Sequence, residues 1–109
     1  MTDTVKTLGQ LNPAATTLTT LYTVPAATST VIASLIVCNS GNTPTTFRVS
    51  IAVAAAADNI KQYIYYDVVI NPNDTFIATI GVTLATTDLI RAYAGNANLS
   101  FSVFGVEAS

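Results

Sequence analysis

The sequence has no histidine and no tryptophan, only one cysteine, and few charged residues. Without histidine it lacks the commonest general base and metal ligand, and it cannot form a Ser-His-Asp or Cys-His catalytic arrangement. The single cysteine, Cys38, cannot form a disulfide within the chain. It stands inside an apolar run with no activating base beside it, so we expect a small core residue and no nucleophile.

Charged residues make up 9% of the 109 residues, whereas about a quarter is usual in a soluble domain. The basic residues are scattered and form no basic patch, which argues against nucleic-acid binding: Lys6, Arg48, Lys61 and Arg91. Half of the residues are apolar, which argues against disorder. Serine and threonine must therefore cover much of the surface, and we expect part of the apolar excess to be buried against other chains.

Several kinds of functional segment are also missing. No apolar stretch reaches the roughly 18 residues of a membrane span, and the first ten residues show no secretory signal pattern. Phosphate-binding loops, Ca²⁺ loops and Cys/His metal spacings do not occur, so we expect no cofactor or metal. Three of the carboxylates fall in expected turns, where aspartate caps backbone N–H groups: Asp58, Asp74 and Asp88. We expect no enzyme, although a pair of carboxylates distant in sequence stays open as the alternative.

What the sequence does contain is a series of short apolar or alternating segments separated by turn signals, at a spacing of about ten residues. The expected strands are 17–24, 29–39, 45–53, 61–70, 75–84, 88–94 and 99–106. This pattern predicts an all-β fold, an antiparallel β-sandwich or jelly roll of about seven to eight strands, in one domain over residues 1–109. We expect residues 1–10 to be an extended N-terminal arm or a short edge strand, and residues 54–57 to be a loop.

The stretch Ser29–Val53 is the most informative. Its first run, Val31–Cys38, is apolar at almost every position, which predicts a strand buried on both faces. The second run alternates, and its expected core face is Phe47, Val49, Ile51 and Val53. We expect the two runs to form a hairpin. Because a two-layer sandwich covers only one face of each strand, the second face of the first run predicts contact with another chain.

Four residues are candidates for a subunit or partner interface: Ile36, Val37, Tyr63 and Tyr65. Of the neighbours Ile36 and Val37, one should face the core and the other a partner, because successive strand side chains point to opposite faces. The tyrosines, together with Tyr66, suit either strand packing or a sugar-stacking platform, so a carbohydrate-binding module stays open.

Five segments follow one another between Leu8 and Glu107: LGQLNPAATTLTTLYTVPA, VIASLIVCNSG, TTFRVSIA, QYIYYDVVINPNDTF and LSFSVFGVE. This series resembles small structural virion proteins of tailed bacteriophages, including cyanophages. The resemblance implies a non-enzymatic protein located in the virion. Together with the size, it implies a capsid cement (decoration) protein, often a homotrimer. Such a protein bridges capsid subunits by contacting the major capsid protein or other virion proteins, and it has no nucleic-acid or membrane partner. A neck, tail or baseplate component is the alternative.

Overall fold

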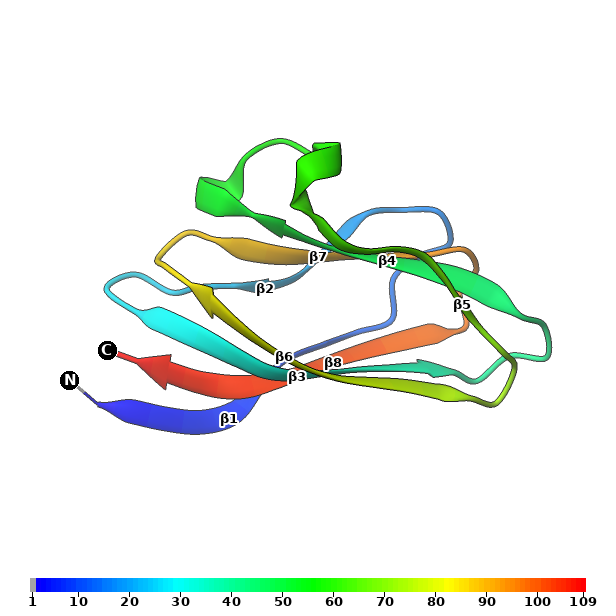
Figure 1. The fold of residues 1–109 in the computed structure, drawn as a ribbon, viewed down its shortest axis with the longest axis horizontal. Helices are drawn as coiled ribbons and strands as arrows, with labels where there is room; N and C mark the ends of the chain where they lie inside the picture. The colour runs from blue at the N-terminus through cyan, green and yellow to red at the C-terminus, as the bar shows by residue number, and fades with distance from the viewer. Residues whose placement is uncertain (1) are drawn as a thin grey trace.

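The computed structural model describes residues 2–109, which form two four-stranded antiparallel sheets packed face to face (Figure 1). We call the sheet with strand order β1-β8-β3-β6 sheet A and the sheet with order β2-β7-β4-β5 sheet B. The strands are β1 (Asp3–Leu11), β2 (Thr19–Thr23), β3 (Ser29–Asn39), β4 (Thr45–Ala52), β5 (Tyr63–Ile70), β6 (Thr75–Leu84), β7 (Leu89–Ala94) and β8 (Leu99–Ala108). Only β4 and β5 are consecutive strands in one sheet. The predicted all-β sandwich of the jelly-roll type is thus confirmed.

Each strand expected from the sequence coincides with one of β2 to β8. The remaining strand is β1, so residues 3–11 form an edge strand that pairs along its length with β8. The loop expected at residues 54–57 overlaps a short 3-10 turn, η1 (Val53–Ala55). A second 3-10 turn, η2 (Ile60–Gln62), takes the first two residues of the strand expected at 61–70, so β5 begins at Tyr63. Asn59 caps the second turn, and a single capped turn leaves no periodic signal in the sequence.

The expected hairpin is wrong. Strand β3 lies in sheet A between β6 and β8, whereas β4 lies in sheet B between β5 and β7. The chain crosses between the layers over residues 40–44, where the buried Asn39 side chain donates to the carbonyls of Thr43 and Ile70 and accepts from the N–H of Gly41. A polar loop with Gly and Pro suits either a hairpin or a crossover. The choice depends on partner strands that are distant in the sequence.

The core lies between the two sheets and is centred on Phe47. The Phe47 ring lies 5.1 Å from Phe76 and 6.1 Å from Phe101, centroid to centroid. Val49 is also buried, as expected, but Ile51 is only partly buried and Val53 is 66% exposed. The expectation for Val53 fails because β4 ends at Ala52 and the chain turns away into η1.

Strand β3 is buried on one face only, which corrects the prediction of a strand buried on both faces. Leu35 and Val37 point inward and are fully buried, whereas Ile36 is partly exposed and Val31 is 43% exposed. The strand alternates like an ordinary sandwich strand, but several of its outward residues are also apolar, among them Val31, Ile36 and Cys38. The second apolar face therefore lies on the outside of sheet A.

Gly105 shows how closely strands β8 and β3 pack at a bulge. It is aligned with Ile32, and a Cβ at residue 105 would run into the carbonyl oxygen of Val31. We expect Gly105→Ala to lower the free energy of unfolding by about 3 kcal/mol, because backbone must shift to admit the methyl group. Urea denaturation measures this. Ser102→Ala on the same strand is the control, with a change within about 0.5 kcal/mol, and an unchanged midpoint for Gly105→Ala would contradict the packing described.

Candidate interface surfaces

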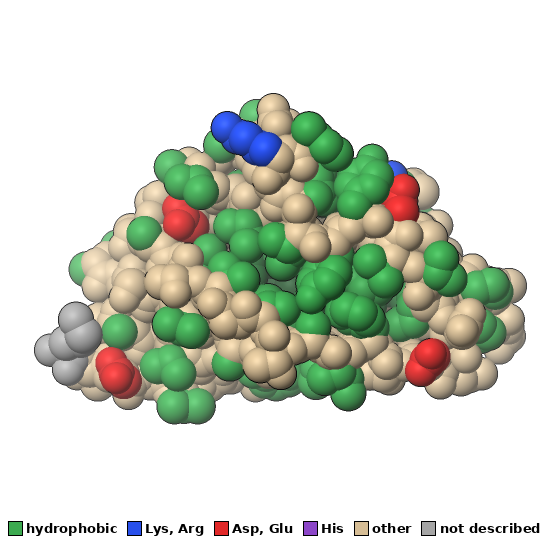
Figure 2. All heavy atoms as spheres, viewed as in Figure 1, with side chains coloured by type: hydrophobic (Ala, Val, Ile, Leu, Met, Phe, Trp, Pro, Cys, Tyr) green, Lys and Arg blue, Asp and Glu red, His purple; other side chains and the backbone are tan. Residues whose placement is uncertain are grey.

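The outer face of sheet A carries a group of hydrophobic side chains from all four strands. We call it the apolar face of sheet A, and its residues are Val5, Val31, Ile36, Ile77, Phe104 and Val106. Val5, Val106 and Val31 form one cross-strand row. Ile36 and Ile77 are cross-strand neighbours in another row. Val5 is 81% exposed and Ile77 is 68% exposed. Hydrophobic side chains project along the lower margin of Figure 2, the side on which sheet A lies in Figure 1.

Charge is almost missing from this face among the described residues. Strands β3 and β6 contain no charged residue. The only charged residue of β8, Glu107, accepts a hydrogen bond from Tyr22 of sheet B, and Lys6 of β1 pairs with the same carboxylate. Of the charged residues in these four strands, Asp3 remains, at the start of β1. Exposed apolar side chains grouped on a face with so little charge are typical of surfaces that other proteins cover.

The outer face of sheet B carries a second, different cluster, which we call the tyrosine cluster: Tyr63, Tyr66, Tyr93 and Arg48. The Arg48 guanidinium lies 4.2 Å from the ring centre of Tyr66 and 4.5 Å from that of Tyr93. The Tyr63 and Tyr66 rings meet edge to face, with centroids 5.1 Å apart. Cation–π contacts of this kind hold the arginine against the two rings, and of the three tyrosines only Tyr66 is exposed.

Hydrogen bonds to two aspartates complete the tyrosine cluster. Arg48 Nε donates to Asp67 Oδ1 at 2.6 Å, which raises the pKa of the guanidinium. The Tyr63 hydroxyl donates to Asp58, and burial together with this bond raises the pKa of Tyr63. The cluster is thus satisfied by its own partners.

The structure separates the four residues singled out from the sequence. Val37 and Tyr65 point into the core, where the Tyr65 ring lies 5.2 Å from Phe76. Ile36 lies on the outer face of sheet A and Tyr63 on the outer face of sheet B. Sequence alternation placed Tyr63 and Tyr65 on one face, but register shifts between β4 and β5 break that alternation.

The two neighbouring tyrosines should therefore differ sharply when truncated. We expect Tyr65→Ala to lower the free energy of unfolding by about 3 kcal/mol, because it removes a ring packed on the core. Tyr66 is 49% exposed, and Tyr66→Ala should cost less than about 1 kcal/mol. Chemical denaturation of both variants measures the difference. Equal losses would show that Tyr65 does not support the core.

Other outward residues escaped sequence analysis. Val5 is an isolated apolar residue in a polar segment. Phe104 and Val106 lie on the face of β8 opposite to the inward residues from which the strand was predicted. Ile77 could have been found from the sequence, because it stands between the outward threonines Thr75 and Thr79 of β6.

Two buried polar atoms in sheet B have no hydrogen-bond partner among the described residues. They are Ser50 Oγ and Arg91 Nη1, and the two residues are cross-strand neighbours.

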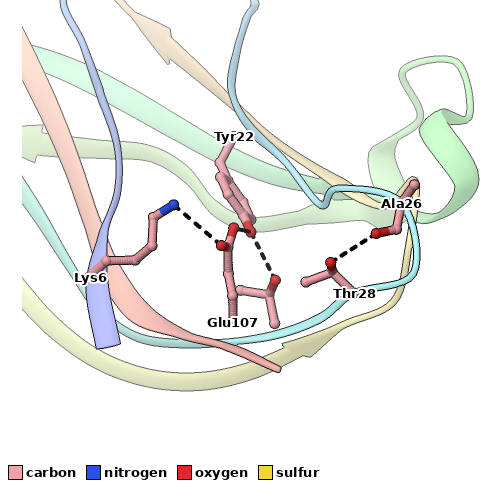
Figure 3. A network of polar contacts seen from close by, with 6 residues as sticks. Lys6, Tyr22, Ala26, Thr28 and Glu107 are labelled. Atoms are coloured by element: carbon pink, nitrogen blue, oxygen red, sulfur yellow. Dashed lines mark hydrogen bonds and ion pairs between the residues drawn. The ribbon is translucent and has the colours of Figure 1, made fainter. Parts of the chain in front are cut away.

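A polar network ties the N-terminal edge strand to both sheets (Figure 3). The Tyr22 hydroxyl lies 2.6 Å from Glu107 Oε2 and 2.8 Å from Thr30 Oγ1. Lys6 Nζ lies 3.3 Å from Glu107 Oε1. The Tyr22 hydrogen bond, followed by Lys6, lowers the pKa of Glu107. Burial first, and then the bond to Glu107, raises the pKa of Tyr22 to about 12.

These pKa shifts predict that the free energy of unfolding falls at acidic pH and again at alkaline pH. The lowered pKa of Glu107 contributes stability that is fully present above the ordinary value of 4.5 and is lost as the pH falls through the folded-state value. The raised pKa of Tyr22 contributes stability below pH 10 that is lost as the pH rises toward 12. We expect wild type to melt at a higher temperature than Glu107→Gln at neutral pH, with the gap narrowing on acidification. A gap that does not change with pH would contradict this.

A pocket of about 440 Å³ opens beside the turns, lined by Ile51, Val53, Ala56, Lys61 and Gln62. Within residues 2–109, no three His, Cys, Asp or Glu side chains come together as a metal site would require. No helix in this part of the chain is long and apolar enough to cross a membrane.

Neither a known protein family nor a curated protein matches the sequence. A search of solved structures finds a pentameric capsid protein isolated from metagenomic phage sequences. That likeness covers 93% of this chain and 61% of the other chain, at 13% identity and a TM-score of 0.38. A likeness at this TM-score does not establish a common fold.

Proposed function

We propose that this protein is a non-enzymatic structural component of a tailed-phage virion, and that it is a capsid cement protein. The apolar face of sheet A carries this proposal, because a sheet face with so little charge suits burial against another protein. The sequence resemblance from Leu8 to Glu107 supplies the virion setting. The partners are the major capsid protein or other virion proteins, together with further copies of the chain.

The proposed mechanism is mechanical. A phage head resists the pressure of packed DNA, and a small rigid domain that touches more than one capsid subunit raises the free energy needed to separate them. Each contact can be weak, because contacts joined in one oligomer act at high effective concentration. A homotrimer would present three apolar faces at once.

The test compares heads that lack the protein with heads to which it has been added back. We expect added protein to raise the temperature at which heads release DNA and to increase survival after osmotic shock. Val31→Lys, in the apolar face of sheet A, should abolish this gain. Val69→Lys is the matched control, since Val69 is a valine of sheet B that is 66% exposed. Equal head stability with and without the wild-type protein would refute the cement role.

A role in the neck, tail or baseplate uses the same apolar face, and copy number separates it from a cement role. A cement protein should be present in numbers comparable with the capsid subunits, whereas a neck or tail part should be present in far fewer copies. Native mass spectrometry of the purified protein tests the trimer, which a monomer would reject.

Carbohydrate binding is the second candidate, favoured by the exposed ring of Tyr66 in the tyrosine cluster. Because Tyr65 packs in the core, the informative substitution is Tyr66→Ala. Glycan-array binding that is lost in Tyr66→Ala would support this candidate, and the absence of any glycan signal for wild type would reject it.

A further inference from the structure

Residues 2–109 form four edge strands, and three of them carry features that discourage pairing with another chain. Strand β2 has only five residues and is followed closely by Pro25. Strand β1 carries Asp3 and Lys6 and is interrupted by a bulge. Strand β5 contains Asp67 at φ 52° and shifts register against β4. Short length, charge, proline and bulges are the usual means by which proteins protect sheet edges.

The fourth edge, β6, is protected far less. It runs for ten residues, Thr75–Leu84, without a charged residue or a proline, and no strand of residues 2–109 pairs with its outer side. Its irregularity is confined to the second half, where Gly81 has φ 56° and the register with β3 shifts. The first half is a regular strand with an open edge.

The hydrogen bonding of β3 identifies which groups of β6 are free. The N–H of Asn39 donates to the carbonyl of Asp74, so the backbone polar groups of Asn39 point toward the start of β6. Hydrogen-bonding direction alternates along an antiparallel ladder, and Val37 is aligned with Phe76. The N–H and C=O groups of Ile77 and Thr79 therefore point to the open side.

We propose that β6 pairs with β6 of a second copy of this chain, antiparallel and about a two-fold axis near Ile77. The pairing joins two copies of sheet A into one continuous eight-stranded sheet. It does not depend on the virion role proposed above.

A second copy is the occupant that fits, because a two-fold axis places a strand against itself. Any charge in β6 would then lie near its own like charge, and β6 has none. Pairing also brings together the two copies of Ile77, which is 68% exposed in one chain. The inward residues Phe76, Ile80 and Val82 stay partly exposed, and Figure 2 shows hydrophobic side chains gathered between the layers. A neighbour along β6 would cover part of them.

This interface produces assemblies with an even number of chains. If a trimer forms through another surface, the β6 pairing joins two trimers. The apolar faces of the two paired copies would be continuous across the axis, which doubles the area one assembly presents.

The test measures the mass of the full-length protein by native mass spectrometry and by sedimentation over a range of concentrations. We expect wild type to form a dimer or a dimer of trimers. Thr79→Pro removes an N–H that the ladder with β3 directs to the open side of β6, and it should raise the dissociation constant by about tenfold or more. Ile77→Lys should do the same through like-charge repulsion. Val5→Lys is the matched control, since Val5 is exposed on the opposite edge strand of the same sheet.

Dissociation by Thr79→Pro and Ile77→Lys, with Val5→Lys unchanged, supports the β6 pairing. Circular dichroism shows that each variant is folded, and Ile77→Lys keeps the test valid if Thr79→Pro fails to fold. A monomeric or solely trimeric wild type overturns the proposal and leaves the edge to a strand of another protein. An even-numbered assembly that survives Ile77→Lys also overturns it.

Discussion

Val37→Lys should unfold the protein, whereas Ile36→Lys should leave it folded. Val37 is fully buried between the sheets, and its neighbour Ile36 lies on the apolar face of sheet A. An ammonium group without a partner in the core costs more than about 5 kcal/mol, which is comparable with the whole stability of a small domain. At residue 36 the long lysine side chain can reach water, so the cost should stay near 1 kcal/mol.

Far-UV circular dichroism and thermal melting distinguish the two variants. The Ile36→Lys protein, like wild type, should melt cooperatively, yet it should fail to stabilise heads. If both variants unfold, the outward side of β3 is part of the internal packing, and the case for an external partner loses its main support. If both stay folded, the assignment of Val37 to the core is wrong.

Among substitutions that shorten a side chain without adding a charge, Phe47→Ala should cause the largest loss in the free energy of unfolding. The Phe47 ring is fully buried and contacts aromatic rings from both sheets, among them Phe76 and Phe101 of sheet A. Removing it leaves a cavity where the two layers meet, and we expect a loss of about 4 kcal/mol. Urea denaturation gives the value from the midpoint and slope.

Phe104→Ala is the control for this truncation, because Phe104 is a phenylalanine on the apolar face of sheet A. It should cost less than about 1 kcal/mol in the isolated protein and should still weaken attachment to heads. Similar losses of stability for Phe47 and Phe104 would contradict the division into a core side and a partner side.

Local sequence was enough to predict the strands, because alternation and turn residues are local signals. It was not enough to predict which strands pair. The loop after Asn39 looked like a hairpin loop, but it crosses between sheets because β3 pairs with β6 and β8, which lie much later in the chain. Pairing depends on contacts between distant residues, which no window of the sequence contains.

The candidate surfaces were predictable only in part. The sequence showed that residues 31–38 had an apolar surplus, and the structure places that surplus on the outside of sheet A. Alternation in the sequence predicted that Tyr63 and Tyr65 face the same way. Because the register shifts along β5, Tyr65 faces the core and Tyr63 faces outward. Bulges move a side chain from one face to the other without a clear sequence signature, since the residue at one of them is Asp67 and not glycine.

Cryo-electron microscopy of intact virions tests the central claim most directly, because it locates the chain and shows which of its surfaces is covered. We predict β-sandwich density on the head at junctions between capsid subunits, with the apolar face of sheet A against a capsid protein. The outward side of Ile36 and Ile77 should be buried there. Density confined to the neck, tail or baseplate, or a domain on the head with sheet A facing solvent, would contradict the proposal.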